Sequence, residues 1–285
     1  MTVPGPSPDQ HGLAAGSEPI RSVRNPLVQA LRRLHRPTGR SEQGLILLEG
    51  THLLQETLAL GLRPRQLLAT ADWMARHADL LERLPDPGRL RLASPEVLAA
   101  AATTGHPDGV LLTLEAADLP VPLPAPDFLL VLDRLQDPGN LGTLLRTALA
   151  AGVEQVWLAE GADPLQPKVL RASSGAALAL PIERMAATDV PARLTAARER
   201  GVQLVAAVVP EADGAAQPYW ELDWCRPTAL LLGNEGAGLA PALARLADRR
   251  VTIPHSRAVE SLNVAAAAAL LLLERPRQAH GRPGA

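Results

Sequence analysis

Residues 128–152 read FLLVLDRLQDPGNLGTLLRTALAAG, and this stretch decides the class of fold. Phe128–Asp133 is an apolar run closed by an acid, which is typical of a strand buried on both faces. Pro138 and Gly139 predict a tight turn after it. A helix is expected over Leu141–Ala151, because four apolar residues share one helical face: Leu141, Leu144, Leu145 and Ala148. Strand, turn and amphipathic helix in succession predict a parallel α/β sheet.

The same alternation continues toward the C-terminus, and a second mixed zone precedes it. Further strands are expected at Gln155–Ala159, Gln203–Val209, Thr228–Gly233 and Arg250–Pro254, with helices at Val190–Arg200 and Leu262–Glu274. In the earlier zone we expect helices at Pro26–Arg36, Thr51–Leu60 and Pro95–Ala102, and strands at Leu45–Glu49, Gln66–Ala69 and Gly109–Leu114. The chain is therefore predicted to hold a mostly parallel α/β sheet and, before it, a small α/β domain of its own.

Prolines mark the boundary between the two zones. They occupy every second position from Pro120 to Pro126, a spacing that prevents helix and ladder pairing and favours a stiff extended connector. We accordingly expect a disordered tail (1–19), an N-terminal domain (20–115), a proline-rich linker (116–127), a C-terminal domain (128–275) and a second tail (276–285).

Composition excludes several classes of protein. The net charge of −2 over 285 residues excludes a polybasic binder, and the single cysteine, Cys225, excludes a disulfide framework or a cysteine-based zinc cluster. The histidines show no ligand spacing, so no metal is expected. The longest apolar run, Val264–Leu273, is too short to cross a membrane, and the first residues lack a signal-peptide core. We expect a soluble, reduced, cytoplasmic protein without membrane contact.

Three predicted strand ends carry polar residues and glycine, and ligands bind at such ends in doubly wound sheets. In the first, Asn140 can cap the following helix, and Arg146 stands nearly two turns into it. Arg146 either reaches into a cleft or lies as a snorkelling surface cation, and the residues alone leave both readings open.

The second strand end, Leu231–Leu239, places three glycines directly after a buried strand, where the backbone can approach a ligand closely. The spacing is neither GxGxxG nor a P-loop. Glu235 in this loop is able to accept hydrogen bonds from a ligand; the alternative is a solvated side chain in an ordinary turn.

The third strand end runs from Ile253 to Val264. Ser261 fits the cap of the next helix, and Asn263 falls in its first turn, where N–H groups point outward. The run Ala265–Leu273 is apolar on every face, which predicts a helix buried between other elements. Ser261 and Asn263 therefore indicate a site, with capping alone as the alternative.

In this order and spacing the three segments resemble the signature motifs of the SpoU (TrmH-like) family of RNA 2′-O-ribose methyltransferases, in the SPOUT superfamily. The first motif is matched by Asp137 through Arg146, the second by Leu232–Leu239, and the third by Ile253 through Val264. The first zone resembles the family's ribosomal-protein-like substrate-binding domain in its Arg24-Asn-Pro opening, Leu48-Glu-Gly50 and Asp108-Gly-Val110.

The resemblance implies a SPOUT domain with a deep trefoil knot, S-adenosylmethionine as methyl donor and a homodimer with the RNA site at the subunit interface. The catalytic set carried over by motif position is Asn140, Arg146, Glu235, Ser261 and Asn263. The cofactor-binding set is Leu232, Gly233, Asn234, Ile253 and Leu262. Arg146 is the family's proposed base, but a guanidinium is only a donor and serves better as a phosphate clamp, so its proton-transfer role stays open.

RNA binding is expected at a basic run without acids, Ser22–Arg40. The predicted contacts are Arg24, Arg32, Arg33 and Arg36, with Arg32 and Arg36 one turn apart on one helix. Ribosomal RNA is the expected substrate because of the extra domain, with transfer RNA as the alternative. A non-catalytic RNA-binding or assembly factor with the same fold remains the rival hypothesis, and a nucleotide-binding oxidoreductase is disfavoured by the missing GxGxxG.

Overall fold

The computed structural model describes residues 18–210, 216–256 and 258–281. The chain divides into two compact units, Met1–Glu115 (unit 1) and Ala116–Ala285 (unit 2). Most of the tail predicted at 1–19 lies outside the described residues, as do the last four residues of the chain.

Unit 1 is built on a four-stranded mixed sheet with strand order β1-β4-β2-β3. Its strands are β1 (Leu45–Glu49), β2 (Gln66–Ala69), β3 (Leu90–Leu92) and β4 (Val110–Glu115). β4 runs antiparallel to both of its neighbours, whereas β2 and β3 are parallel. The sequence predicted all of these strands except β3, which has only three residues.

Helices cover the sheet of unit 1. They are α1 (Pro26–Arg33), α2 (Pro37–Gln43), α3 (Thr51–Ala59), α4 (Ala71–Arg76), α5 (Ala78–Glu82) and α6 (Pro95–Ala101), with a 3-10 turn, η1, at Pro87–Arg89. Val28 and Leu31 of α1 pack with Val97 and Leu98 of α6 to form one core. The short helices α4 and α5 have too few turns for an apolar period to be recognised, and the sequence analysis missed them.

The basic helix predicted at Pro26–Arg36 begins at Pro26 as expected but ends three residues early, at Arg33, and a second helix, α2, starts at Pro37. Pro37 starts α2 and holds the preceding residue, Arg36, in an extended conformation (φ −107°, ψ 145°). α1 therefore ends at Arg33. Arg36 is the N-cap residue of α2 and does not stand one helical turn from Arg32 on a shared helix.

Unit 2 contains a seven-stranded sheet in which every pair of neighbours is parallel, which confirms the predicted fold class. The strand order is β7-β6-β5-β10-β8-β11-β9. The strands are β5 (Phe128–Asp133), β6 (Gln155–Ala159), β7 (Ile182–Met185), β8 (Gln203–Ala207), β9 (Gln217–Pro218), β10 (Thr228–Leu232) and β11 (Arg249–Thr252). The sequence missed β7 and β9, the two edge strands, which lack a fully buried apolar run.

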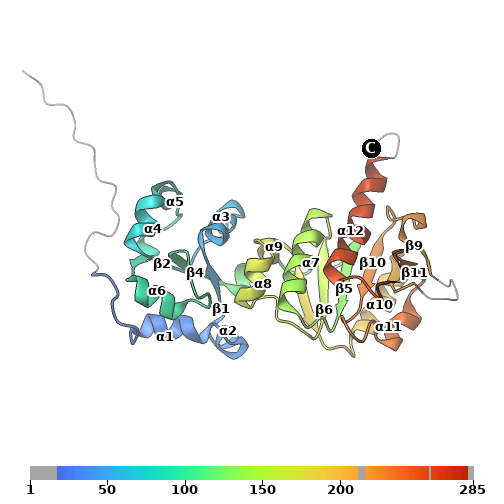
Figure 1. Ribbon diagram of the computed structural model, residues 1–285, viewed down its shortest axis with the longest axis horizontal. Helices are drawn as coiled ribbons and strands as arrows, with labels where there is room; N and C mark the ends of the chain where they lie inside the picture. The colour runs from blue at the N-terminus through green and yellow to red at the C-terminus, as the bar shows by residue number, and fades with distance from the viewer. Residues whose placement is uncertain (1–17, 211–215, 257, 282–285) are drawn as a thin grey trace, which may run out of the picture. The chain divides into compact units, whose positions relative to one another are not determined.

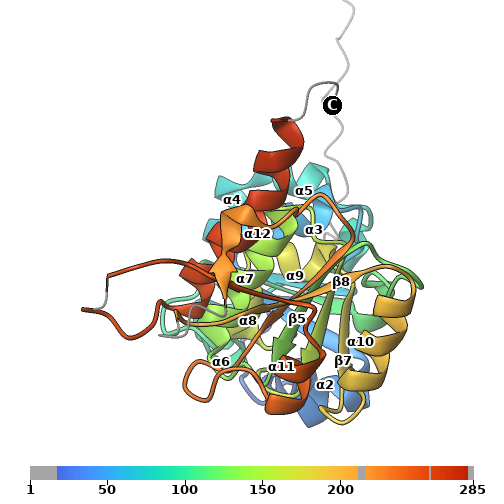
Figure 2. The ribbon, with the colours of Figure 1, turned by 90° about the vertical axis from the view of Figure 1, so that its right-hand side faces the viewer.

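Helices cover both faces of this sheet, as Figures 1 and 2 show. They are α7 (Pro138–Ala150), α8 (Pro167–Ala172), α9 (Ala176–Ala179), α10 (Val190–Glu199), α11 (Pro241–Leu246) and α12 (Val264–His280), with 3-10 turns η2 (Ala116–Asp118) and η3 (Tyr219–Glu221). α10 and α11 pack on one face through Val190, Leu194 and Leu243. α7 and α12 pack together on the other. Burial on both faces explains why the central strands are apolar throughout.

The proline-rich segment has no helix or strand between residues 119 and 127. Its backbone is held by side chains at the start of β6. The N–H of Leu123 donates to Gln155 Oε1 over 2.8 Å, and the N–H of Asp127 donates to Glu154 Oε2 over 2.6 Å. Part of this segment thus lies along the sheet of unit 2.

Two expectations for the last helix are wrong. Leu270 and Leu273 of α12 are 45% and 44% exposed, so the helix is not buried on every face and leaves an outer face open. The helix also continues to His280 through the predicted tail, with Pro276 inside it. Gln278 explains the continuation, since its amide donates to Leu222 O and accepts from the N–H of Trp224.

Candidate functional site

The carboxyl ends of β5, β10 and β11 share one edge of the parallel sheet of unit 2, and the three sequence motifs follow these ends. Parallel strands place such loops together whatever their separation in sequence. The first motif loop therefore meets the second and third at one edge, although about 100 positions of sequence separate it from them.

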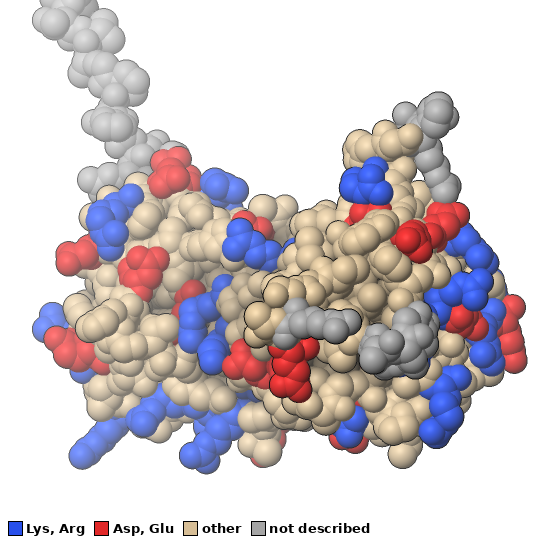
Figure 3. Space-filling view, turned by 45° about the vertical axis from the view of Figure 1, so that its right-hand side comes forward, with Lys and Arg blue, Asp and Glu red and all other residues tan. Residues whose placement is uncertain are grey.

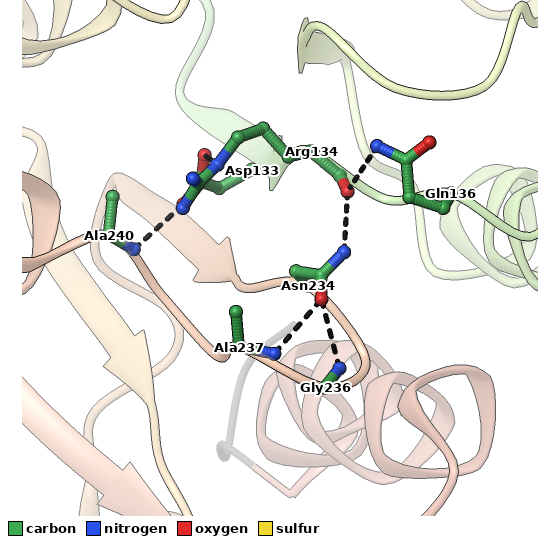
Figure 4. A network of polar contacts seen from close by, with 7 residues as sticks. All are labelled: Asp133, Arg134, Gln136, Asn234, Gly236, Ala237 and Ala240. Atoms are coloured by element: carbon green, nitrogen blue, oxygen red, sulfur yellow. Dashed lines mark hydrogen bonds and ion pairs between the residues drawn. The ribbon is translucent and has the colours of Figure 1, made fainter.

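A network of hydrogen bonds ties the first two motif loops together (Figure 4). Asp133, which ends β5 and is 1% exposed, binds the guanidinium of Arg134 with both carboxylate oxygens and accepts the N–H of Ala240 over 2.7 Å. Arg134 has a positive φ of 55°, and its carbonyl accepts the Asn234 amide over 2.9 Å. Asp133 was not among the predicted site residues, although a carboxylate closing an apolar strand is a signal that points to it.

The second loop closes on itself after β10. Asn234 exchanges two backbone hydrogen bonds with Gly238, of 3.0 and 2.9 Å, and its side-chain oxygen accepts the N–H groups of Gly236 and Ala237. A Cβ atom at Gly233 would lie 2.1 Å from the backbone of Gly238. Glycine is therefore required at position 233 for the loop to fold this tightly.

Three of the five predicted catalytic residues form a continuous chain of hydrogen bonds across all three motifs. The Asn140 amide donates to Glu235 Oε1 over 3.2 Å, and its oxygen accepts the Asn263 amide over 3.0 Å. The N–H groups of Gln136 and Asp137 also donate to the Glu235 carboxylate, both over 3.3 Å. Residues 95 and 123 positions from Asn140 are thus in direct contact with it.

Glu235 is held as a carboxylate. Partial burial raises the pKa of its carboxyl, but hydrogen bonds from its own backbone N–H, the Asn140 amide and the N–H groups of Gln136 and Asp137 together outweigh it. The pKa of Glu235 therefore lies below its ordinary value. A carboxylate in this state accepts hydrogen bonds and orients Asn140.

The caps of the two helices that leave this edge differ from the predicted ones. Asp137, not Asn140, caps α7, because Pro138 takes the first helical position and the Asp137 side chain accepts the N–H of Asn140 over 2.7 Å. Asn263, not Ser261, caps α12 and accepts the N–H groups of Ala265 and Ala266. Asn140 is consequently free to point at Glu235 and Asn263.

Arg146 and Ser261 lie outside this chain of hydrogen bonds. Arg146 is exposed and donates to Ser174 Oγ over 3.2 Å, on the turn between α8 and α9. Ser174 was not predicted as a site residue; its positive φ of 49° is not readable from sequence. Ser261 is exposed and makes no hydrogen bond with any residue in the described ranges. The structure of one chain does not bring these two catalytic candidates to Asn140.

The predicted cofactor-binding residues all lie at the same edge of the sheet. Leu232 is buried at the end of β10, and Gly233 and Asn234 begin the closed loop after it. Ile253 follows β11, and Leu262 precedes the cap of α12; both are half-buried. Of these five residues only Leu232 is fully buried, and none of them carries a charge.

The four predicted RNA-binding arginines, Arg24, Arg32, Arg33 and Arg36, are exposed in unit 1. Figure 3 shows basic side chains along the lower margin of this unit, where α1 and α2 lie in Figure 1. Arg40, in the same basic run, is buried and donates to Leu34 O over 2.8 Å. Arg40 therefore has a structural role within the unit.

Away from this edge, the described residues hold a hollow but neither a cluster of metal ligands nor a membrane-spanning helix. A hollow of about 390 Å³ lies at the amino ends of β8, β10 and β11, the opposite edge of the sheet, and includes Arg198, Arg226 and Asp248 in its lining. No cluster of metal ligands and no helix able to span a membrane occurs in residues 18–210, 216–256 and 258–281.

A parallel sheet with three polar loops joined at its carboxyl edge is the architecture of a SPOUT-type methyltransferase, and the comparisons agree with it. The SpoU rRNA Methylase family model matches residues 127–273, and the MRM3-like substrate binding domain model matches residues 25–112. The chain belongs to the SpoU rRNA methylase family.

Individual relatives cover nearly the whole chain. An uncharacterised tRNA/rRNA methyltransferase of Synechocystis is 46% identical over 91% of this chain and 93% of its own length. The 23S rRNA (guanosine(2553)-2'-O)-methyltransferase RlmP of Bacillus subtilis is 32% identical over 89% of this chain and 97% of its own. The crystal structure of an AdoMet-bound rRNA methyltransferase from Sinorhizobium meliloti has a TM-score of 0.76 and 31% identity, covering 92% and 98% of the two chains.

Proposed function

We propose that this protein transfers a methyl group from S-adenosylmethionine to a ribose 2′-hydroxyl of 23S ribosomal RNA. The observation that carries the proposal is the Glu235–Asn140–Asn263 chain, which joins all three motif loops in a member of the SpoU family. Ribosomal RNA is preferred to transfer RNA because RlmP, similar over almost its whole length, is named for 23S rRNA.

The closed loop and its neighbours fit the methyl donor. Gly236 and Gly238 have no Cβ, and the space beside their backbones is open, with only Asn234 Oδ1 within 4 Å of a Cβ at Gly236. Exposed backbone groups next to Ile253 and Leu262 suit a flat, polar-edged adenine and its ribose. We assign cofactor contacts to Leu232, Gly233, Asn234, Ile253 and Leu262.

The bound cofactor would supply an already activated methyl group on a sulfonium. What remains for the protein is to hold the ribose oxygen in line and to assist loss of its proton. Glu235 is occupied by three separate donors and positions Asn140, and Asn140 in turn meets Asn263. Glu235, Asn140 and Asn263 together form the surface of the site on which the ribose is placed.

Arg146 acts as a donor toward the RNA backbone in this proposal. A guanidinium carries five N–H groups and no acceptor, and its charge favours the phosphate next to the reacting ribose. Ser261 supplies a free hydroxyl at the same edge of the sheet. Both are assigned to the catalytic set on their motif positions.

A homodimer completes the site in this proposal. In one chain Arg146 is directed to Ser174 rather than to Asn140. A second copy of the chain would bring its own Arg146 to the Asn140 cluster. α12 leaves Leu270 and Leu273 exposed, and Leu149 on the adjacent α7 is 42% exposed. Such an apolar surface suits a subunit interface. The deep trefoil knot stays a prediction, as does the cytoplasmic location.

Unit 1 recruits the RNA. Arg24, Arg32, Arg33 and Arg36 are exposed guanidinium groups on one short segment, which suits contact with successive phosphates. The six aromatic residues of the chain are too few for a base-stacking surface, so recognition is expected to rest on RNA shape and backbone.

The test compares wild type with Arg146→Ala, using unmethylated 23S rRNA transcribed in vitro and radiolabelled S-adenosylmethionine. We expect wild type to label one 2′-O position and Arg146→Ala to lose at least a hundredfold in rate, about 2.7 kcal/mol of transition-state stabilisation. Cofactor affinity by calorimetry should stay within a few-fold. Cofactor binding without methyl transfer to any RNA by wild type would favour the non-catalytic RNA-binding factor instead.

A further inference from the structure

Lys168 is the only lysine among the 28 basic side chains of this protein. It is exposed and occupies the second position of α8. A cation in the first turn of a helix is opposed by the positive end of the helix dipole, at a cost of about 0.3–1 kcal/mol. No carboxylate in the described ranges lies within ion-pair distance of it. Helix stability therefore does not account for a positive charge here.

The packing of α8 on α7 places Lys168 at the carboxyl edge of the sheet. A Cβ at Gly142 of α7 would lie 2.4 Å from Ala172 Cβ, so the absent side chain lets the two helices touch. One turn further along α7, Arg146 reaches Ser174, so the two segments advance in the same direction. Lys168 precedes Ala172 by one helical turn of α8, just as the first turn of α7 precedes Gly142. Lys168 therefore lies beside the first turn of α7, which carries Asn140.

We propose that the Lys168 ammonium group binds a backbone phosphate of the RNA strand whose ribose is methylated. The inference rests on the proposed function and adds a substrate contact to it. Lys168 and Arg146 stand on adjacent parallel helices, so a strand crossing α7 and α8 meets both charges. An ammonium is a compact point charge, which suits a single phosphate oxygen without a fixed fork geometry.

The test uses the fact that an amine-specific reagent modifies only two kinds of group in this chain, Lys168 and the terminal α-amino group. Full-length protein is acetylated with and without saturating 23S rRNA transcript, and both groups are followed by peptide mass spectrometry. We expect RNA to slow acetylation of Lys168 at least fivefold relative to the α-amino group, and S-adenosylmethionine alone to have no effect.

Two variants and a matched control extend the test. Lys168→Gln should raise KM for RNA about tenfold with kcat within twofold, and lower the slope of log affinity against log salt by about 0.7–0.9. Lys168→Arg keeps the charge and should keep the wild-type slope. Arg200→Gln removes an exposed charge at the opposite end of the sheet and should change neither KM nor slope.

The outcomes separate this inference from the proposed function. A wild-type protein that methylates 23S rRNA but whose Lys168 is acetylated equally fast with RNA bound overturns the phosphate contact alone. The phosphate contact is also overturned if Lys168→Arg lowers the salt dependence of RNA affinity as much as Lys168→Gln does. A wild-type protein that neither binds nor methylates RNA overturns the proposed function first.

Discussion

At the scale of single residues, Asn263 has two roles that substitution can separate. Its side-chain oxygen caps α12, and its amide nitrogen donates to Asn140. A cap needs only an acceptor, whereas contact with Asn140 needs a donor as well. The same residue therefore contributes to both the stability of the helix and the order of the site.

Asn263→Ala should lower the free energy of unfolding by about 1 kcal/mol through the lost cap, and lower methyl transfer at least tenfold. Asn263→Asp should keep the cap and the melting temperature but lose activity to a similar extent. The second carboxylate oxygen of the introduced aspartate would face the side-chain oxygen of Asn140 and repel it. Rotating the Asn140 amide by half a turn would not help, because the Asn140 oxygen would then face the Glu235 carboxylate. Thermal unfolding and single-turnover rates measure the two effects; full activity of Asn263→Asp would contradict the role of the Asn140 contact.

At the scale of elements, the C-terminal turns of α12 depend on Glu274. Its carboxylate, 4% exposed, binds Arg277 over 2.5 and 2.7 Å and Gln278 over 2.9 Å. The bond to Arg277 lowers the pKa of Glu274 most; burial opposes this, and Gln278 lowers the pKa further. These contacts hold the last helical turns beyond Pro276.

Because the folded pKa of Glu274 is depressed, its stabilisation is present above its unfolded pKa, near 4.5, and is lost as pH falls through the folded value. Glu274→Gln should reduce stability at pH 7 by on the order of 1 kcal/mol. The difference from wild type in thermal unfolding should disappear as the pH falls below the depressed folded pKa of Glu274. Glu199→Gln, an exposed helix carboxylate, serves as the control; an unchanged difference at low pH would argue against the Glu274 contacts.

At the scale of the whole molecule, the open apolar face of α12 and α7 bears on assembly. Leu270 and Leu273 are nearly half exposed although they lie in the most apolar segment of the chain. Surfaces of this kind are uncommon on monomers unless they are used for binding. The proposed homodimer uses this face.

If the proposed homodimer forms through this face, Leu270→Glu combined with Leu273→Glu should leave a monomer of 30.1 kDa in sedimentation velocity and reduce methyl transfer, because charges buried at an interface lack partners. Leu60→Glu, at a similarly exposed apolar position in unit 1, should leave the oligomeric state unchanged. A wild-type chain that sediments as a fully active monomer would contradict the proposed interface.

Much of this architecture was readable from local sequence. The bounds of β5 and β6 were predicted to the residue because each is an apolar run with a sharp polar or turn boundary. The three motif loops were found because glycine, asparagine and proline concentrate where strands end. Periodicity failed where elements are short, as in α4, α5, α8 and α9, or lie at sheet edges, as in β7 and β9.

By itself, the sequence determined the α/β class and the three polar strand ends, since both depend on side chains close together along the chain. Only the tertiary structure decided that Asn140, Glu235 and Asn263 touch while Arg146 turns to Ser174. It also decided that Asp137 and Asn263 are the caps, that a second helix begins at Pro37 and that α12 extends to His280. The reason is physical: the contacts of Asn140 with Glu235 and Asn263 join distant segments, as do those of Gln278 with Leu222 and Trp224, and their free energy is not encoded in any local window of residues. The caps and the end of α1 are instead choices between neighbouring residues, each of which fits the local pattern.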